Sequence, residues 1–210
     1  MGKILNGILG GVSGKVAGVV GARWKDKHYL RSYAVPANPQ SDLQIVQRDL
    51  FKYCVAFAKV LVGPVFNAFT DRLISSMSGF NYFIKSNITL FTSVPTLSSV
   101  KITEGKLYMG TIDSAEYDTG ANTVLVHFDD ALGNNGALTD KVYMVVYDTV
   151  GKLFYFPPAA VNRSVGELEA SGVPSGLTAG NIRVWVFACK LYHEMPTMVS
   201  NSITAVCTAA

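Results

Sequence analysis

The strongest constraint on the fold of this chain is a change in hydrophobic periodicity near residue 88. From there on, Thr, Val and Tyr alternate with polar residues, and turn clusters such as DTGAN and GVPSG recur at short intervals. About seven short strands in roughly 110 residues are typical of an immunoglobulin-like or fibronectin-like antiparallel β-sandwich. The predicted strands are residues 105–110, 123–129, 141–148, 152–156, 164–170, 181–192 and 199–207.

The predicted strand at residues 181–192 has two apolar faces. One face carries Trp185, Phe187, Cys189 and Leu191, and the other carries Val184, Val186 and Ala188. A strand of this kind is usually buried on both sides. We therefore expect it either to be central in its own subunit or to have one face covered by another subunit.

Before residue 88 the apolar spacing is helical. Ser41 lies three residues before Gln44, the spacing of a capping box that begins a helix. Gly63-Pro64 interrupts the pattern, and Pro64 suits the first turn of a second helix. FNYFIKSN, at residues 80–87, predicts a third, short helical segment, so the whole fold is expected to be α+β with two to three helices. The apolar stripe of the first helix is Leu43, Val46, Leu50, Cys54, Phe57 and Leu61, and that of the second is Val65, Phe66, Phe69, Leu73 and Ile74.

The first 21 residues hold seven glycines interleaved with Ile, Leu and Val. Such a segment is too flexible for a good helix and too apolar for a solvated tail, so we expect an arm that becomes ordered against a second copy of the chain. The β-prone runs VAGVVGARW and HYLRSYAVP predict a hairpin at residues 16–35. The residues expected at an assembly interface are Ile4, Leu5, Ile8, Leu9, Val12, Val16, Val19, Arg23, Trp24, Lys25, Lys27 and Arg31.

Length and charge suggest the organisation of the chain. Its 210 residues are enough for one domain or two small ones. We expect an N-terminal arm, hairpin and helical domain at residues 1–92, a linker at 93–100 and the sandwich at 101–210. Residues 1–85 carry eleven Lys or Arg and four Asp, a net charge of +7, whereas the remainder carries −4. This asymmetry is compatible with two ordinary solvated faces, with contact between the basic part of one subunit and the acidic part of the next, or with nucleic acid.

No pattern in the sequence indicates catalysis, a metal or a cofactor. The three histidines are scattered, and the cysteines Cys54, Cys189 and Cys207 lack CxxC spacing and are expected to be reduced thiols. GVSGK does not have the spacing of a phosphate-binding loop, and Asp129-Asp130 is expected to belong to a simple turn rather than to a calcium site. We expect neither a secretory signal nor a membrane span, and hence synthesis in a bacterial cytoplasm without a signal peptide.

Three stretches of the sequence support a resemblance. The opening MGKILNGILGGVSGKVAGVVGARWKDK, then NPQSDLQIVQRDLF and SGFNYFIKSN, resemble an uncharacterised family widespread in Bacteroidota and their phages, with motifs G-x-x-G-K-x-G…W-K and N-P-x-[ST]-x-x-Q-x-x-x-R. The match is good over residues 1–90. The same arrangement recurs in phage virion proteins, so the resemblance implies a structural role. The matching positions are Asn38, Pro39, Ser41, Gln44, Arg48, Gly79, Asn81 and Phe83.

The sequence therefore favours a non-enzymatic structural subunit of a phage virion or a comparable extracellular homo-oligomer, with itself and other assembly proteins as partners. One alternative is an adhesin or glycan-binding module in which Tyr155, Phe156 or Tyr192 offers a sugar platform. Another is nucleic-acid binding by residues 23–31, where cations alternate with aromatic side chains.

Overall fold

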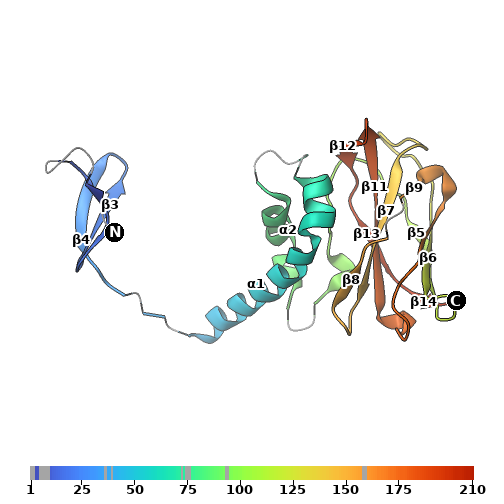
Figure 1. Ribbon diagram of the computed structural model, residues 1–210, viewed down its shortest axis with the longest axis horizontal. Coiled ribbons are helices and arrows are strands. Elements are labelled where there is room, and N and C mark those ends of the chain that lie inside the picture. The colour runs from blue at the N-terminus through green and yellow to red at the C-terminus, as the bar shows by residue number, and fades with distance from the viewer. Residues whose placement is uncertain are drawn as a thin grey trace. The chain divides into compact units, whose positions relative to one another are not determined.

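The computed structural model describes residues 3–4, 10–35, 37–38, 40–71, 73, 77–92, 95–157 and 160–210 (Figure 1). The chain forms two compact units, Met1–Asp42 and Leu43–Ala210. Residues 95–100, in the segment expected to be a linker, lie inside the second unit. The helices and sheets of residues 43–210 thus belong to one body.

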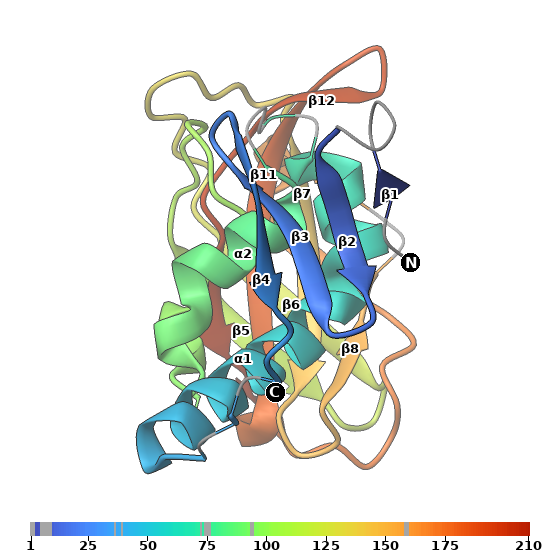
Figure 2. The ribbon, with the colours of Figure 1, turned by 90° about the vertical axis from the view of Figure 1, so that its left-hand side faces the viewer.

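The N-terminal unit is an antiparallel sheet in the order β1-β2-β3-β4, three strands of which are seen side by side in Figure 2. Its strands are β1 (Lys3–Ile4), β2 (Val12–Val16), β3 (Val19–Trp24) and β4 (Lys27–Ser32). The predicted hairpin is confirmed as β3 and β4. Residues 12–16 of the expected arm are instead a strand, because β3 of the same chain supplies their hydrogen bonds. Leu5, Ile8 and Leu9 lie outside the described residues.

A long helix opens the second unit. It comprises α1 (Asp42–Leu61) and, without a break, the π-helical segment η2 (Val62–Thr70). The predicted interruption at Gly63-Pro64 is therefore wrong. A proline lacks an N–H and its ring strikes the carbonyl four residues earlier in an α-helix, whereas a wider π turn accommodates it. The wider turn ends where the Asp71 N–H donates to Phe66 O, at 2.8 Å.

The expected third helical segment is confirmed as α2 (Gly79–Asn87), which begins at Ser78, whose side chain accepts from the Asn81 N–H. Single 3₁₀ turns follow at η3 (Ile88–Leu90) and η4 (Leu97–Ser99). The Asn87 side chain ties this segment together, because it donates to Phe83 O at 2.9 Å and to Lys101 O at 3.1 Å and accepts from the Lys101 N–H at 3.0 Å. The end of α2 is thus fixed to the chain that leads into the sheets.

The rest of the second unit is two sheets. One has the order β10-β6-β5-β14, in which β14 runs parallel to β5, and the other has the order β12-β11-β7-β8, with β13 also on β11 and β9 on β7. The strands are β5 (Ile112–Asp118), β6 (Thr123–Phe128), β7 (Lys141–Asp148), β8 (Leu153–Tyr155), β9 (Val161–Asn162), β10 (Glu167–Ala170), β11 (Ile182–Tyr192), β12 (Met195–Val199), β13 (Ile203–Val206) and β14 (Thr208–Ala209). The 3₁₀ turns η5 (Arg163–Val165) and η6 (Ala179–Asn181) lie between them.

Six of the seven predicted strands are confirmed, as β6, β7, β8, β10, β11 and β13, whereas β5, β9, β12 and β14 were not predicted. The prediction at residues 105–110 is wrong, since only a single bridge, from Leu107 to Ser200, forms there. The strand of that region is β5, which the sequence analysis missed. An α+β fold with several antiparallel and mixed sheets is therefore established, whereas an immunoglobulin-like topology stays a prediction.

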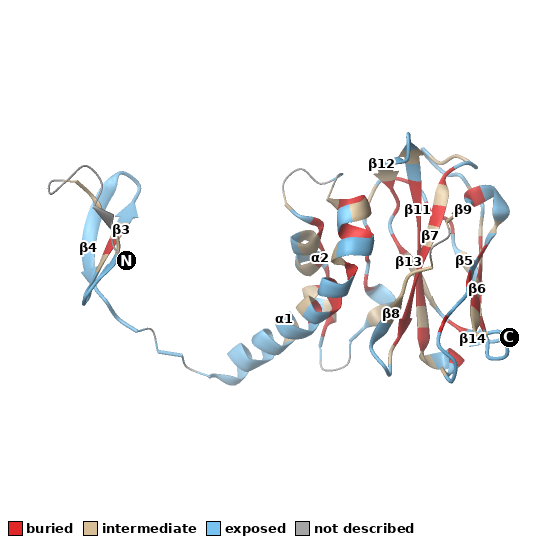
Figure 3. Ribbon diagram, viewed as in Figure 1, coloured by how far each residue is buried: buried red, intermediate tan, exposed pale blue. Residues whose placement is uncertain are grey.

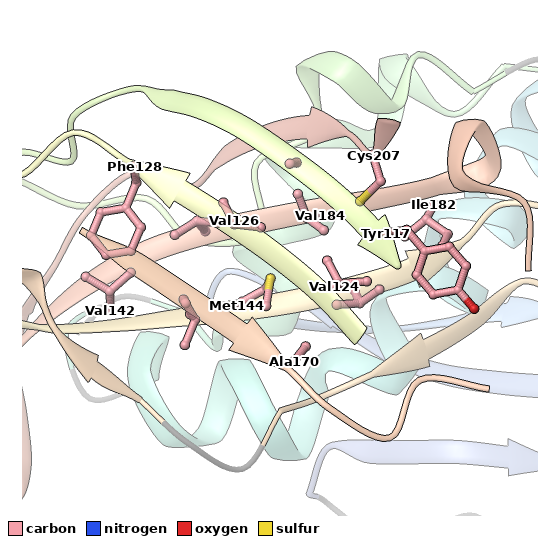
Figure 4. Packing of buried hydrophobic residues seen from close by; sticks show 14 of the residues in the cluster. Tyr117, Val124, Val126, Phe128, Val142, Met144, Ala170, Ile182, Val184 and Cys207 are labelled. Carbon is pink, nitrogen blue, oxygen red and sulfur yellow. The ribbon is translucent and has the colours of Figure 1, made fainter. Parts of the chain in front are cut away.

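Two apolar cores hold the second unit together. The first lies between the two sheets and includes Val124 and Val126 of β6, Val142 of β7 and Val184 of β11 (Figure 4). The second lies on the other face of β7 and β11, where the helices α1, η2 and α2 cover Trp185, Phe187 and Cys189. The prediction of a central strand with two buried faces is confirmed for β11. Its second face is covered by the chain's own helices, not by another subunit.

The three cysteines are buried and free, as expected. Cys54 and Cys189 belong to the second core and Cys207 to the first. Burial raises the pKa of Cys54 to about 11 and that of Cys189 and of Cys207 to about 12. None of the three is therefore a reactive thiolate near neutral pH.

Candidate functional site

The apolar stripe of α1 is covered along only part of its length. Cys54, Phe57 and Leu61 are buried in the second core, as predicted. Leu43 and Val46, which lie on the same stripe, are 83% and 56% exposed. Figure 3 shows this first half of α1 as exposed, whereas buried residues gather in its second half. One helix face thus passes from a packed core to solvent, and the predicted burial of Leu43 and Val46 is wrong within a single copy of the chain.

The spacing along this face is that of a coiled-coil seam. Leu43, Val46, Leu50, Tyr53 and Phe57 recur at alternating intervals of three and four residues, which is the a/d pattern of a heptad repeat. Such a seam buries its knobs against a second helix of the same kind. Of these five, only Phe57 is buried in the described structure. We call Leu43, Val46, Leu50 and Tyr53 the open stripe.

The continuous helix Asp42–Thr70 is also long and apolar enough to cross a membrane by length and composition, with a mean hydropathy of 1.4 over its best window. Almost half of that window, 44%, is buried inside the protein. Core helices pass the same test of length and composition, and the buried part of this helix lies in the second core.

The N-terminal sheet separates its side chains by face. The register pairs Val16 with Val19, and Gly21 with Leu30, which places Val16, Val19 and Leu30 on one face. All three are exposed. Gly21 lies at the centre of this face, where a Cβ would strike the backbone carbonyl of Val12. This close approach explains at least one glycine of the glycine-rich segment.

The opposite face of the same sheet is aromatic and basic. The register pairs Trp24 with Lys27, and the next residues of the same parity on β4 are Tyr29 and Arg31. Trp24 is 64% exposed, and Lys27 and Arg31 are exposed as well. We call Trp24, Lys27, Tyr29 and Arg31 the basic aromatic face.

Arg23 does not belong to the basic aromatic face. Arg23 is one residue out of phase with Lys27, so its side chain projects from the other side of the sheet. It pairs with Asp26 at 2.9 Å and donates to Lys25 O at 2.8 Å. Lys25 lies in the β3–β4 turn with a positive φ of 53°, and its Nζ lies over the Trp24 ring, 5.1 Å from the centroid. A grouping of Arg23 with Lys25 and Lys27 on one face is therefore wrong for Arg23.

The motif residues divide into a surface group and a core group. Asn38, Ser41, Gln44 and Arg48 are exposed along the approach to α1 and its first turns, and Pro39 lies outside the described residues. Ser41 directly precedes the helix, as the capping-box spacing predicts. Gly79, Asn81 and Phe83 build α2, where Gly79 is buried, its N–H donates to Asp71 Oδ1, and Phe83 stacks on Phe57 with ring centroids 5.8 Å apart.

A buried cation that the sequence analysis missed organises the loop between β6 and β7. Arg163 is fully buried, and its guanidinium donates to Ala131 O at 2.9 Å and to Tyr108 O at 2.5 Å. Its charge lies 4.0 Å from Asp140 Oδ2, which in turn accepts from the Ala137 N–H at 2.7 Å. Nothing in the local sequence marks this arginine, because it lies in a polar turn. Its role is to hold loops together.

The acidic and histidine residues do not assemble a reaction centre in the described part of the chain. Asp129 Oδ1 accepts from the Ala131 N–H at 2.9 Å, the geometry of an ordinary turn. His127 and Glu167 face each other at 3.8 Å on a half-exposed sheet surface. No group of three or more His, Cys, Asp or Glu side chains suited to a metal occurs among the described residues.

The aromatic residues considered for sugar binding do not gather on one surface. Tyr155 packs against the first core and Phe156 against the second, whereas Tyr192 is 68% exposed at the end of β11. A sugar platform needs neighbouring aromatic faces that are open to solvent. Tyr192, beside His193, is the member of the three that offers one.

A groove of about 690 Å³ opens between α1, the segment after α2, and the β7–β8 hairpin. Aromatic side chains form part of its walls: Phe57 comes from α1, Phe91 from the end of η3, and Tyr147 and Phe154 from the sheet. The residues Thr92, Thr96, Ser98 and Thr149 add hydroxyl groups to the lining. Two cations, Lys152 and Arg183, also line it. The volume falls in the range of small-molecule sites.

Comparison with known proteins identifies the family. Residues 11–204 match a family of unknown function, DUF6266, and the chain therefore belongs to that family. No curated protein and no solved structure matches the chain. Family membership therefore covers both units but supplies no activity.

Proposed function

We propose that this chain is a non-enzymatic structural subunit of a homo-oligomer. The observation that carries the proposal is the open stripe of α1. The same helix face is packed in its second half and bare in its first half. A bare apolar seam of this length is the mark of a missing partner.

A second copy of the chain is the partner that the spacing favours. Heptad seams pair with seams of the same kind, and a homo-oligomer brings two or three such helices together by symmetry. The apolar face of the N-terminal sheet, with Val16, Val19 and Leu30, offers further surface to the same assembly. The N-terminal unit carries six Lys or Arg and two Asp, a net charge of +4, whereas residues 43–210 carry −1, so contact between unlike parts of two copies is favoured as well.

The setting of the assembly follows from the motif resemblance. We place it in a phage particle or a comparable extracellular structure, made in a bacterial cytoplasm, with the two-sheet part acting as an immunoglobulin-like module. Electron microscopy of the purified protein after negative staining tests this setting: regular rings, tubes or fibres support it, and uniformly small single particles contradict it.

The role of the open stripe is tested by light scattering coupled to size-exclusion chromatography of the full chain. The variant Leu43→Glu/Val46→Glu places two charges in the seam. Burial of each of these side chains is worth about 1.5–3 kcal/mol, so their loss weakens association by a factor of roughly 10² to 10⁴. We expect the wild-type protein to be an oligomer and the variant to be a monomer.

A matched control comes from the same helix turn. Ile45 is also apolar and 40% exposed, but it lies on the roughly opposite side of α1. Ile45→Glu should keep the oligomer, and circular dichroism should show the same helix content in all three proteins. A wild-type protein that stays monomeric at high concentration, or an oligomer that survives the double change, contradicts the proposal.

The basic aromatic face favours a second candidate function, nucleic-acid binding. Cations at Lys27 and Arg31 beside the rings of Trp24 and Tyr29 are suited to phosphates and stacked bases. Single-stranded DNA should then be bound at low salt and released as salt rises. Lys27→Glu/Arg31→Glu should abolish binding, and absence of binding by the wild-type chain at low salt removes this candidate.

A further inference from the structure

The groove beside α1 contains two cations without counter-charges. Within the described residues, neither Arg183 nor Lys152 forms an ion pair, and no carboxylate lines the groove. The closest acidic residue along the hairpin, Asp148, is occupied by its own turn, where it accepts from the Val150 N–H at 3.0 Å and the Gly151 N–H at 2.8 Å. The groove therefore combines aromatic and hydroxyl-bearing walls with two cations.

Arg183 is the better placed of the two cations. It is on β11 directly opposite Tyr147 of β7, which is one of the aromatic walls. Its Nε is buried and has no hydrogen-bond partner among the described residues. Burial also lowers the pKa of its guanidinium, and no carboxylate offsets that effect. A buried N–H without a partner costs free energy, which a bound acceptor recovers.

We propose that this groove binds a small molecule with a flat apolar body and one anionic head group. The body packs over the exposed parts of Tyr53, Val60 and Phe154, and the head group accepts hydrogen bonds from Arg183, with Lys152 adding charge at the edge. A planar guanidinium suits the two oxygens of a carboxylate, sulfonate or phosphate.

Charge argues against the N-terminal unit of a second copy as the occupant. That unit has a net charge of +4 and would meet Arg183 and Lys152 with like charge. The groove adjoins the open stripe, because Tyr53 of α1 belongs to both.

The test uses two dyes that differ in one group. 8-Anilinonaphthalene-1-sulfonate has an aromatic body and an anionic head, and N-phenyl-1-naphthylamine has the same body without the sulfonate. Fluorescence titration of the full chain should give an affinity for the sulfonate at least tenfold higher than for the neutral dye. Arg183→Met should reduce the affinity for the sulfonate about tenfold and leave that for the neutral dye unchanged.

Control variants separate the groove from other apolar surfaces. Arg31→Met, in the N-terminal sheet, and Leu43→Glu, in the open stripe, should leave sulfonate binding unchanged. Lys152→Gln lies on an exposed turn and tests the same site if Arg183→Met fails to fold; it should weaken sulfonate binding about threefold. Equal affinity for both dyes, or sulfonate binding that is lost in Leu43→Glu but kept in the groove variants, overturns the proposal.

The nature of the head group is resolved by displacement of the bound dye. 1-Naphthoate and 1-naphthyl phosphate share one apolar body and carry a carboxylate and a phosphate. The stronger competitor identifies the preferred anion. Failure of both to displace the sulfonate dye contradicts a site for amphipathic anions.

Discussion

Replacement of Phe57 is the sharpest test of how the helices are joined to the sheets. The ring of Phe57 is 7% exposed and has five aromatic neighbours. They come from α2, from the segment after it, and from β7, β8 and β11, with centroids 4.8–5.9 Å away. Phe57→Ala therefore removes the aromatic contacts that join α1 to each of these elements.

The magnitude follows from burial and from these ring contacts. Truncation of a buried phenylalanine to alanine costs about 3–5 kcal/mol, and each aromatic pair contributes roughly 0.5–1.5 kcal/mol, much of which is already contained in that cost. We expect a loss of about 4 kcal/mol. With a urea dependence of about 2 kcal/mol per molar, the midpoint of unfolding falls by about 2 M.

The assay is urea unfolding followed both by far-ultraviolet circular dichroism, which reports helix, and by the fluorescence of Trp185, measured in a Trp24→Phe background. Both signals should shift together, because residues 43–210 share their cores. Phe51→Ala is the control: Phe51 is on the same helix and is 51% exposed, so its loss should shift the midpoint little. A shift below about 0.5 M for Phe57→Ala, or two separate transitions, would refute the reasoning.

Three further predictions concern single features of the second unit. Gly79→Ala brings a Cβ to within 2.9 Å of Asp71 Oδ1 and 3.0 Å of Thr70 Cβ, and should cost about 1–3 kcal/mol in urea unfolding, whereas Gly63→Ala, which meets nothing within 4 Å, should be neutral or slightly stabilising. Arg163→Met leaves the buried Asp140 without its cation and should cost about 3–5 kcal/mol, part of which the added change Asp140→Asn should restore; a cost under 1 kcal/mol would contradict the buried network. Burial raises the pKa of the three cysteine thiols, so as the pH rises above 9 the folded state keeps protons that the unfolded state has lost. Their contribution to the free energy of unfolding is therefore complete below pH 9 and disappears as the pH rises towards 12. Iodoacetamide at pH 8 should label the thiols only in urea, and rapid labelling of the native protein would show the burial to be wrong.

The sequence was informative where burial and periodicity coincide. The strands at β7 and β11 could be predicted almost to the residue, because each is a continuous run of mostly apolar, β-prone residues. The strand β5 could not, because IDSAEYD buries only Ala115 and Tyr117, and four of its other five positions are Asp, Ser or Glu. The interruption predicted at Gly63-Pro64 was wrong because the sequence rules for proline assume an α-helix and do not include a π turn.

The candidate site was harder to predict than the fold. An apolar stripe has the same sequence pattern whether its own chain or another molecule covers it, so Leu43 and Cys54 could not be distinguished before the structure placed them. The groove was missed because its walls come from three distant segments around Phe57, Phe91 and Arg183. Face assignment in the N-terminal sheet depends on register, and one residue of register separates Arg23 from Lys27.

The unbroken helix also fixes how its exposed and buried apolar patches are oriented relative to each other about the helix axis. Each residue of an α-helix advances the chain by roughly 100° about the axis, so the direction in which Leu43 and Val46 face is locked to the direction in which Phe57 and Leu61 face. Insertion of one residue near position 52 would leave both patches intact in composition and yet swing one away from the other by about a quarter turn. In the proposed homo-oligomer, the number of residues between the two patches, and not only their identity, would therefore fix the angle at which two copies meet.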